Sequence, residues 1–376
     1  MSFFLPSSNH RQPRWELHSI ERFSDYLTVW NELNAQGPES PLLSTDFVFP
    51  VMNHFGRPDN LLAICKLGTN PIAMALLAPV GIGRWSTLNP IVDPLQPPVA
   101  PLGLLVARKD TQITELLPRL LKALPGFPLV LSVMNQDDRL VPRPNNAGSF
   151  NTIDHITTPS IHINTSYSIY WKSRKAHFKQ NLRRRRKLLL TSGRIPLLEI
   201  LSSTDSSNIA FDDFCKIEHS GWKGKEGVSL EHNRLIKQCY QDIINNFFRN
   251  GNALIYKYFY DNRIAAMDIC LKNYNTLFVF KTTYDEAESV TGPAFLMREE
   301  QLRSMFDQGK VGPRIEFYGP LMDWQRRWAT EVRTMYHLNC YRFNFIREIN
   351  EKIKAIQRLK LRLKPNQTQR SGTEND

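Results

Sequence analysis

The chain has 376 residues, 41 % of them apolar, and its 21 Phe, 12 Tyr and 7 Trp supply bulk for cores, which predicts two folded domains and excludes a disordered protein. Its five cysteines are scattered, odd in number and without CxxC spacing, so we expect no disulfide framework, no metal site and a reducing compartment. The net charge of +12 is concentrated, because ten Lys and Arg but no Asp or Glu lie between Trp171 and Arg194. The N-terminal apolar stretch is too short for a signal peptide and no apolar run reaches membrane length, so we expect a cytoplasmic protein without a transmembrane segment.

The first half of the chain shows a faint pattern of strands and helices. Leu61–Leu67 and Pro71–Ala78 are predicted to pair across the turn Gly68-Thr69-Asn70. The proline-rich run Pro90–Pro101 is interpreted as a long loop. The other predicted elements are a strand at Trp15–His18, helices at Ile20–Leu33, Thr45–Phe55 and Thr111–Leu124, and a strand at Pro128–Val133.

A basic amphipathic helix is predicted to connect the two halves over residues 166–194. Apolar residues such as Phe178 and Leu182 recur at helical spacing, Lys and Arg cover the other sides, and Gly193 ends the pattern. Three interpretations stay open for the charged residues 172–187: a solvated face whose apolar stripe packs between the halves, a site for an anionic partner, or a nucleic-acid regulator.

The second half has a clearer order of elements. Asp261-Asn262 predicts a two-residue hairpin turn, and Pro293 begins a helical pattern. In chain order we predict a strand at Ile195–Leu201, helices at 207–220 and 229–250, strands at Ala253–Tyr260, Arg263–Leu271 and Thr276–Tyr284, a helix at Pro293–Gln308, a strand at Arg314–Tyr318 and a helix at Trp324–Leu338. After Arg347, Lys and Arg alternate with Ile and Leu through Lys364, which predicts a helix and then a disordered end. The two halves repeat one order of elements, which predicts a duplicated fold.

Three segments have amino-acid sequences similar to motifs of a known family. They are KSRKAHFKQNLRRRRKLLLTSG (Lys172–Gly193), IEHSGWKGKEGVS (Ile217–Ser229) and YDEAESVTGPAFL…IEFYGPLMDWQRRW (Tyr284–Trp328). They resemble, in this order, an Arg-rich helix ending in Gly, a His…Trp…Gly-x-Ser element, and a Pro-Gly helix start followed by a last strand. These belong to the CelD-like (cellulose-biosynthesis-type) acetyltransferases of the GNAT superfamily, which are related to Fem-type peptidyltransferases.

The resemblance implies an α/β (α+β) fold of tandem GNAT-like domains, each a mixed, mostly antiparallel sheet flanked by helices. We expect a degenerate GNAT-like domain at 1–165, the connecting helix at 166–194, a GNAT domain with an acyl-CoA site at 195–345, and a basic helical, then disordered, tail at 346–376. The proline-rich loop stands where the second half has its third strand and glycine turn, so the cofactor site is expected in the second half.

Gly292-Pro293-Ala294 is the expected cofactor seat. CoA carries a pyrophosphate, and free amides at a helix N-terminus bind anions. Gly292 permits close backbone approach and Pro293 suits the first helical position; an ordinary Pro-started helix is the alternative. The resemblance implies that the thioester of acetyl-CoA, or of another acyl-CoA, lies where the third strand separates from the next. The expected contacts are the amides of Ala294, Phe295 and Leu296 and the strand end at Lys281, Thr282, Thr283 and Tyr284.

Acyl transfer to an amine needs orientation, a base and donors for the thioester oxygen. His219 is the first candidate base because its ordinary pKa lies near working pH, although it could equally cap helix carbonyls. Asp268 interrupts an apolar strand, so its carboxylate either points into a cleft, where it could be catalytic, or pairs with a lysine. Glu316 could act as base or hold a substrate ammonium. Tyr284 could donate to the departing thiolate. The second shared segment adds Trp222 and Ser229 as expected substrate contacts.

These observations predict an N-acyltransferase that moves an acyl group, in the simplest case acetyl, from acyl-CoA to an amine of a small molecule or saccharide. One alternative is a Fem-like transferase that uses aminoacyl-tRNA and contacts its backbone through the basic helix. Another is a catalytically inactive GNAT-like binding protein, because the family's Pro-Gly, Asp and Lys are replaced by Gly292-Pro293, Glu316 and Gln325.

Overall fold

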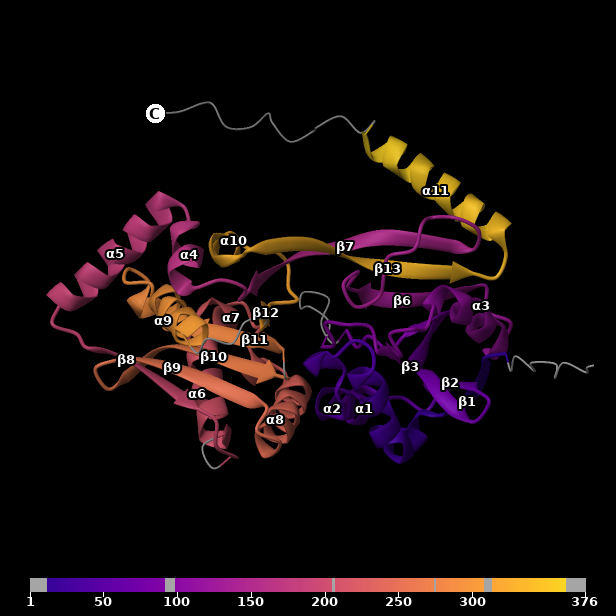
Figure 1. Cartoon of the computed structure of the whole chain (residues 1–376), viewed down its shortest axis with the longest axis horizontal. Helices are drawn as coiled ribbons and strands as arrows, with labels where there is room; N and C mark the ends of the chain where they lie inside the picture. The colour runs from indigo at the N-terminus through magenta and orange to yellow at the C-terminus, as the bar shows by residue number, and fades with distance from the viewer. Residues whose placement is uncertain (1–11, 92–98, 205–206, 274, 308–312, 363–376) are drawn as a thin grey trace, which may run out of the picture.

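The strands of the chain form one continuous sheet, and helices pack along it (Figure 1). The structure is a computed structural model that describes residues 12–91, 99–204, 207–273, 275–307 and 313–362. The end predicted to be disordered after Lys364 and most of the proline-rich loop lie outside these residues. Among the residues that are described, no helix is long and apolar enough to cross a lipid bilayer.

In the first half, the central residues of Leu61–Leu67 (β2) and Asn70–Gly81 (β3) are buried on both faces of the sheet, which explains their continuous apolar runs. β2 and β3 meet at a turn where Gly68 takes a φ of 66°, a value that glycine adopts without strain. The elements are β1 (Arg14–Ser19), α1 (Leu27–Ala35), α2 (Thr45–Phe55), β2 (Leu61–Leu67), β3 (Asn70–Gly81), β4 (Arg84–Thr87), β5 (Leu105–Ala107), α3 (Ile113–Ala123), β6 (Val130–Gln136) and β7 (Phe150–His162).

The second half follows its predicted order up to its last strand. In α8 the Asn233 side chain accepts a hydrogen bond from the Ile236 amide, and Gly251, at a φ of 67°, follows the helix end. The elements are α4 (Tyr167–Lys172), α5 (Ala176–Thr191), β8 (Pro196–Leu201), α6 (Ser207–Ser220), α7 (Trp222–Lys225), α8 (Arg234–Arg249), β9 (Ala253–Tyr260), β10 (Arg263–Lys272), β11 (Thr276–Tyr284), α9 (Pro293–Asp307), β12 (Arg314–Glu316), α10 (Asp323–Trp328), β13 (Glu331–Tyr341) and α11 (Asn344–Arg362).

The sheet repeats one arrangement in each half. Its strand order is β1-β2-β3-β4-β6-β13-β7-β12-β11-β10-β9-β8, with β5 also paired to β3. In the first half β1 to β4 are antiparallel and β4 then pairs in parallel with β6; in the second, β8 to β11 are antiparallel and β11 pairs in parallel with β12. The predicted mixed, mostly antiparallel sheet flanked by helices is therefore confirmed.

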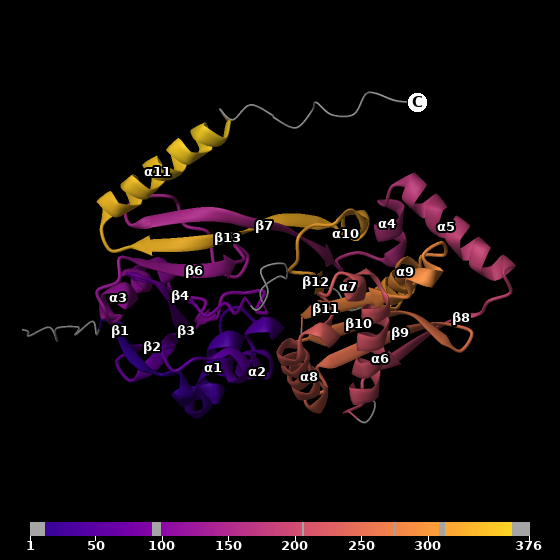
Figure 2. The same ribbon diagram turned by 180° about the vertical axis from the view of Figure 1, so that it is seen from behind.

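The two halves exchange their last strands. β7, from the first half, pairs with β12, whereas β13, from the second half, pairs with β6. β7 and β13 also pair with each other from Glu331↔Ser160 to Cys340↔Phe150, and together they cross between the halves in both views (Figures 1 and 2). Each half thus completes the sheet of the other.

The exchange corrects the last predicted helix. Trp324–Leu338 was expected to be helical, but α10 ends at Trp328 and β13 begins at Glu331. As a strand, this segment pairs on both sides, with β6 and β7. Pairing with distant strands outweighs local helix preference here. The strand β7 was not predicted at all.

The connecting helix is in fact two helices, α4 and α5. The break falls at Ser173–Lys175, where Lys175 has extended backbone angles (φ −58°, ψ 137°). Between the helices, the Arg174 guanidinium donates to the carbonyl oxygens of Trp328 and Ala329, at 3.1 and 2.6 Å. The break places this arginine at the C-terminal end of α10, where a positive charge interacts favourably with the unpaired helix carbonyls.

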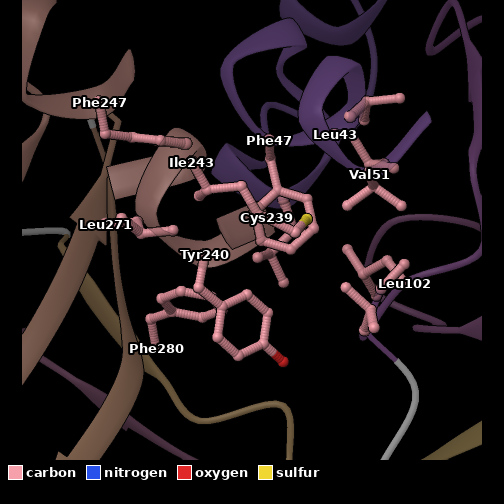
Figure 3. Packing of buried hydrophobic residues seen from close by; sticks show 14 of the residues in the cluster. Leu43, Phe47, Val51, Leu102, Cys239, Tyr240, Ile243, Phe247, Leu271 and Phe280 are labelled. Carbon is pink, nitrogen blue, oxygen red and sulfur yellow. The ribbon is translucent and has the colours of Figure 1, made fainter. Parts of the chain in front are cut away.

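Helices of both halves share one apolar core. Phe47 and Val51 of α2 face Cys239 and Ile243 of α8, with Phe280 of β11 beneath them (Figure 3). The rings of Phe47 and Phe280 meet edge to face, 5.9 Å between centroids. Burial of each such side chain stabilises the fold by about 1.5–3 kcal/mol, so this core holds the halves together independently of the exchanged strands.

A buried ion network anchors the exchanged strand β13. Arg333 donates to Asp137, just after β6, at 2.7 Å, and to Glu316 of β12, also at 2.7 Å. Arg314 and Arg139 approach the other oxygen of Glu316 at 3.1 and 3.4 Å. Both carboxylates are fully buried. Because water does not reach these carboxylates, their negative charges must be balanced by arginine. The network is therefore stable only while Arg333 is in place.

We predict that Arg333→Met lowers the free energy of unfolding by about 3–5 kcal/mol, because it leaves two buried carboxylates without their shared cation while keeping an apolar side chain of similar length. The control is Arg22→Met, which removes an exposed pair with Asp25 and should cost at most about 1 kcal/mol. Urea unfolding followed by circular dichroism measures both. Equal midpoints for the two variants would contradict the proposed anchoring.

Candidate functional site

A cavity of about 410 Å³ opens where β11 and β12 diverge. The two strands pair for three residues only, from Thr276↔Arg314 to Phe278↔Glu316. β11 continues to Tyr284, paired on its other side with β10. The strand end therefore presents a backbone edge that no described strand covers, and this edge forms one wall of the cavity.

The cavity collects part of the predicted site. Trp222, Thr282, Thr283 and Tyr284 line it, as do Gly292, Ala294 and Phe295 at the start of α9. The remaining lining residues are Arg185 of α5, Glu218, Gly221 and Lys223 around α7, Glu286 and Ser289 of the loop before α9, Arg298 of α9, and Trp324 and Trp328 of α10. Residues of α5, α6, α7, β11, α9 and α10 therefore meet here around a hollow with aromatic walls.

The start of α9 is held against Arg185. Gly292 has a φ of 62°, and a Cβ at this position would overlap the Arg185 guanidinium. The amides of Phe295 and Leu296 both donate to the Gly292 carbonyl, at 3.0 and 3.3 Å. The expectation that three successive amides are free is therefore wrong for these two, because the helix itself uses them. Among the described groups, only the Ala294 amide of this turn has no acceptor.

Arg185 lines the cavity and has no carboxylate partner among the described residues. Its Nη1 contacts the carbonyl oxygens of Ser289 and Val290 at 3.3 and 3.4 Å, and its Nε donates to Asn181. By contrast, Arg186 pairs with Glu299 and Glu300, and Arg194 with Glu288. Burial, with the nearby charges of Arg184 and Arg327, lowers the pKa of Arg185. A crowded, unpaired cation at a helix N-terminus is suited to bind an anion such as phosphate.

Asp268 lies behind the cavity, not in it. Its carboxylate is fully buried, accepts from Thr282 Oγ1 at 2.7 Å and forms an ion pair with Arg298 Nη2 at 2.6 Å. Both partners line the cavity, so Asp268 positions them. Two buried donors of lining residues, Arg298 Nε and Trp328 Nε1, have no partner within the described part of the chain.

Glu218 supplies a carboxylate at another part of the cavity wall. It is buried, accepts from Lys223 Nζ at 2.6 Å and from the Leu230 amide at 2.9 Å. Burial alone would raise its pKa, but the charges of Lys223 and Lys281 and these hydrogen bonds outweigh burial, and the pKa is lowered. Burial and the charge of Lys281 in turn lower the pKa of Lys223. Glu218 is thus an ionised carboxylate at the cavity.

Several predicted site residues lie elsewhere. His219 is exposed and shares Ser229 with His232, at 3.0 and 2.9 Å, so neither His219 nor Ser229 lines the cavity. Glu316 belongs to the ion network of β13. The remaining three are Lys281, whose ammonium lies 4.6 Å from the Tyr240 ring centroid, and Pro293 and Leu296, which are buried.

The sequence contained a signal for Glu218 that the prediction missed. In α6, Phe211, Phe214 and Cys215 are buried, and position 218 follows them at helical spacing on the same face. His219 lies one residue on and points away from that face. Arg298 and Trp328 gave no such signal, because a buried arginine and a tryptophan on a short helix are identified only by the elements packed on them. Within the described residues, no group of three or more His, Cys, Asp or Glu is arranged to hold a metal ion.

The comparisons with known proteins agree with this geometry. Residues 176–326, which contain every lining residue of the cavity except Trp328, match the family model described as acetyltransferase (GNAT) domain. No curated protein matches the chain. The family match supports an acyltransferase.

Two solved structures share the overall fold. FemX has 8 % sequence identity and a TM-score of 0.55, over 84 % of this chain and 96 % of that chain. A conserved protein of unknown function from Bacteroides thetaiotaomicron VPI-5482 has 10 % identity and a TM-score of 0.52, over 88 % of this chain and 100 % of that chain. At these identities the likeness shows the fold alone, and it extends over both halves.

Proposed function

We propose that the second half of the chain transfers an acyl group, in the simplest case acetyl, from acyl-CoA to an amine of a small molecule or saccharide, as its resemblance to CelD-like acetyltransferases suggests. The observation that carries the proposal is the cavity between the end of β11, whose edge no described strand covers, and the start of α9. Arg185, which has no carboxylate partner among the described residues, lies beside it. A strand edge, a helix N-terminus and a free cation together suit a long ligand that ends in phosphates.

Acyl-CoA has the features that these groups would recognise. Arg185 and the Ala294 amide would bind the pyrophosphate, and the backbone of Thr282 to Tyr284 would hydrogen-bond the amides of the pantetheine arm. The aromatic walls, Phe295 among them, would exclude water from the thioester. Exclusion of water strengthens every polar contact to the reacting carbonyl.

Glu218 replaces His219 as the proposed base. The acceptor amine attacks the thioester carbonyl carbon, the C–S bond breaks, and the carboxylate of Glu218 takes the proton that the amine loses. Lys223 keeps Glu218 ionised, and Tyr284, which lines the same cavity, would protonate the departing thiolate. A positioned base of this kind typically contributes about 10²–10⁴-fold to the rate.

We predict that Arg185→Met raises the Kd for acetyl-CoA about tenfold or more, because a charge-assisted contact to phosphate is lost. Arg184→Met is the matched control: the residue is adjacent, exposed and also basic, and its removal should change the Kd less than about threefold. Calorimetric titration measures both. Wild-type affinity in Arg185→Met, or no binding by any form, would contradict the proposed seat.

We predict that Glu218→Gln lowers kcat about 10²-fold or more with little change in the Kd for acetyl-CoA, because glutamine cannot accept the proton. The rate of CoA release is measured with the best acceptor from a panel of amino sugars, polyamines and amino acids. Glu226→Gln, at an exposed glutamate just after α7, serves as control. A full rate in Glu218→Gln would remove this residue from the reaction.

Each of two alternative functions predicts a different result in these experiments. The exposed Arg183, Arg184 and Lys187 of α5 favour an aminoacyl-tRNA donor, in which case the protein would consume aminoacyl-tRNA and ignore acetyl-CoA. Binding of acetyl-CoA without transfer to any amine would instead support an inactive GNAT-like binding protein.

A further inference from the structure

Two basic amphipathic helices, α5 and α11, lie along one side of the molecule. In both views they stand at opposite ends of the molecule, α11 beyond the crossing strands β7 and β13 and α5 beside α4 and α9, while α1, α2, α6 and α8 lie on the other side (Figures 1 and 2). Neither helix is enclosed by the body of the protein. The cavity described above uses only the inner face of α5, through Arg185.

α11 presents apolar side chains to solvent. Phe345, Ile349 and Ile353 follow one another at intervals of four residues, and they are 58, 52 and 47 % exposed. Residues at this spacing share one helix face. The stripe continues at the helix base, where the exposed rings of Phe343 and Phe345 stack with centroids 5.6 Å apart. A monomeric soluble surface rarely leaves such a continuous apolar patch uncovered.

The same helix is basic. Residues 344–362 contain six Lys and Arg against two Glu. At its base, the Arg342 guanidinium lies 4.2 Å from the ring centroid of Phe127, itself an exposed aromatic. Two copies of this helix would repel each other if they paired through the apolar stripe. The charge therefore disfavours a second copy of the chain as the occupant and favours an anionic one.

α5 repeats this combination at the other end of the same side. Lys172, Lys175, Arg183, Arg184 and Lys187, on and just before the helix, are exposed, while Phe178, Leu182 and Leu189 are buried against the body. Exposed leucines at 188 and 190 accompany the charges. Phosphates of a nucleic acid would satisfy the cations but not the aliphatic and aromatic side chains. An anionic lipid surface satisfies both.

We propose that this side of the molecule binds the surface of an anionic lipid bilayer. α11 lies in the headgroup region with Phe345, Ile349 and Ile353 toward the acyl chains, and α5 makes a second, electrostatic contact. Two separated contacts fix the orientation of the protein on the membrane and strengthen binding, because the second forms at high effective concentration. This binding does not depend on the acyl-transfer activity.

Co-sedimentation of the full chain with vesicles tests the proposal. Vesicles of phosphatidylcholine with about one third phosphatidylglycerol should bind the protein, and pure phosphatidylcholine should bind it at least about tenfold more weakly. Binding should also weaken as salt is raised, since the electrostatic contacts are at the surface. Equal binding to both vesicles, or binding to neither, would overturn the proposal.

Variants separate the two kinds of contact. Replacing Phe345, Ile349 and Ile353 together by Ser should lower partitioning about tenfold or more, and Arg183→Glu with Arg184→Glu and Lys187→Glu should lower it in a salt-dependent way. Ile209→Ser, at another exposed apolar side chain, on α6, should have no effect. All these positions are exposed, so the variants should melt like the wild type, and unchanged partitioning in the first variant would overturn the proposal.

A parallel binding experiment with tRNA tests whether the surface binds a nucleic acid instead of a lipid membrane. If tRNA binds the wild type and the triple Ser variant equally well while anionic vesicles bind neither, then the surface is a nucleic-acid site and the lipid proposal fails. If anionic vesicles bind the wild type but not the triple Ser variant, then the apolar stripe of α11 is the membrane contact. Because no acyl-CoA is used, failure here leaves the proposed acyl transfer untouched.

Discussion

The contact of Arg333 with Asp137 and Glu316 joins the exchanged strand β13 to both halves of the protein at once. Because β13 pairs with β6 and β7 pairs with β12, neither sheet is complete without the other half. The cavity depends on the same arrangement. Trp328, which forms one of its walls, directly precedes β13, and Arg174 binds the carbonyl of Trp328 from the break between α4 and α5. The ion network that anchors β13 therefore also helps to fix one side of the cavity.

The two halves share an arrangement of strands but differ at the position of the cavity. In the first half two short strands, β4 and β5, both pair with β3 and are separated by an intervening segment. In the second half one continuous strand, β11, takes the corresponding place. A hollow at the start of α3 contains Arg108, Arg139 and Arg143, but each pairs with a carboxylate: Asp110, Glu316 and Asp154. Arg185 has no such partner among the described residues. The proposed anion site is therefore in the second half, where an arginine of the cavity wall has no carboxylate partner among the described residues.

Local patterns predicted most elements, and long-range pairing decided the rest. Thr276–Tyr284 and Ala253–Tyr260 were predicted with the bounds that the structure has, because branched and aromatic residues end there at clear turns. The local pattern of Glu331–Leu338 predicts a helix because the strand partners of this segment lie about two hundred residues away in the chain, at β6. Glu316 looks like a site residue for the same reason, since nothing near it in sequence shows that Arg333 of an exchanged strand neutralises it.

The central claim is that acyl-CoA binds between the edge of β11 and the start of α9. Hydrogen exchange with and without saturating acetyl-CoA tests it most directly, since bound ligand slows exchange of the amides that it covers. The account predicts slower exchange at 279–284 and around Ala294, and unchanged exchange at β5 and the start of α3. Slower exchange at β5 and α3 alone, or no change anywhere, would contradict it.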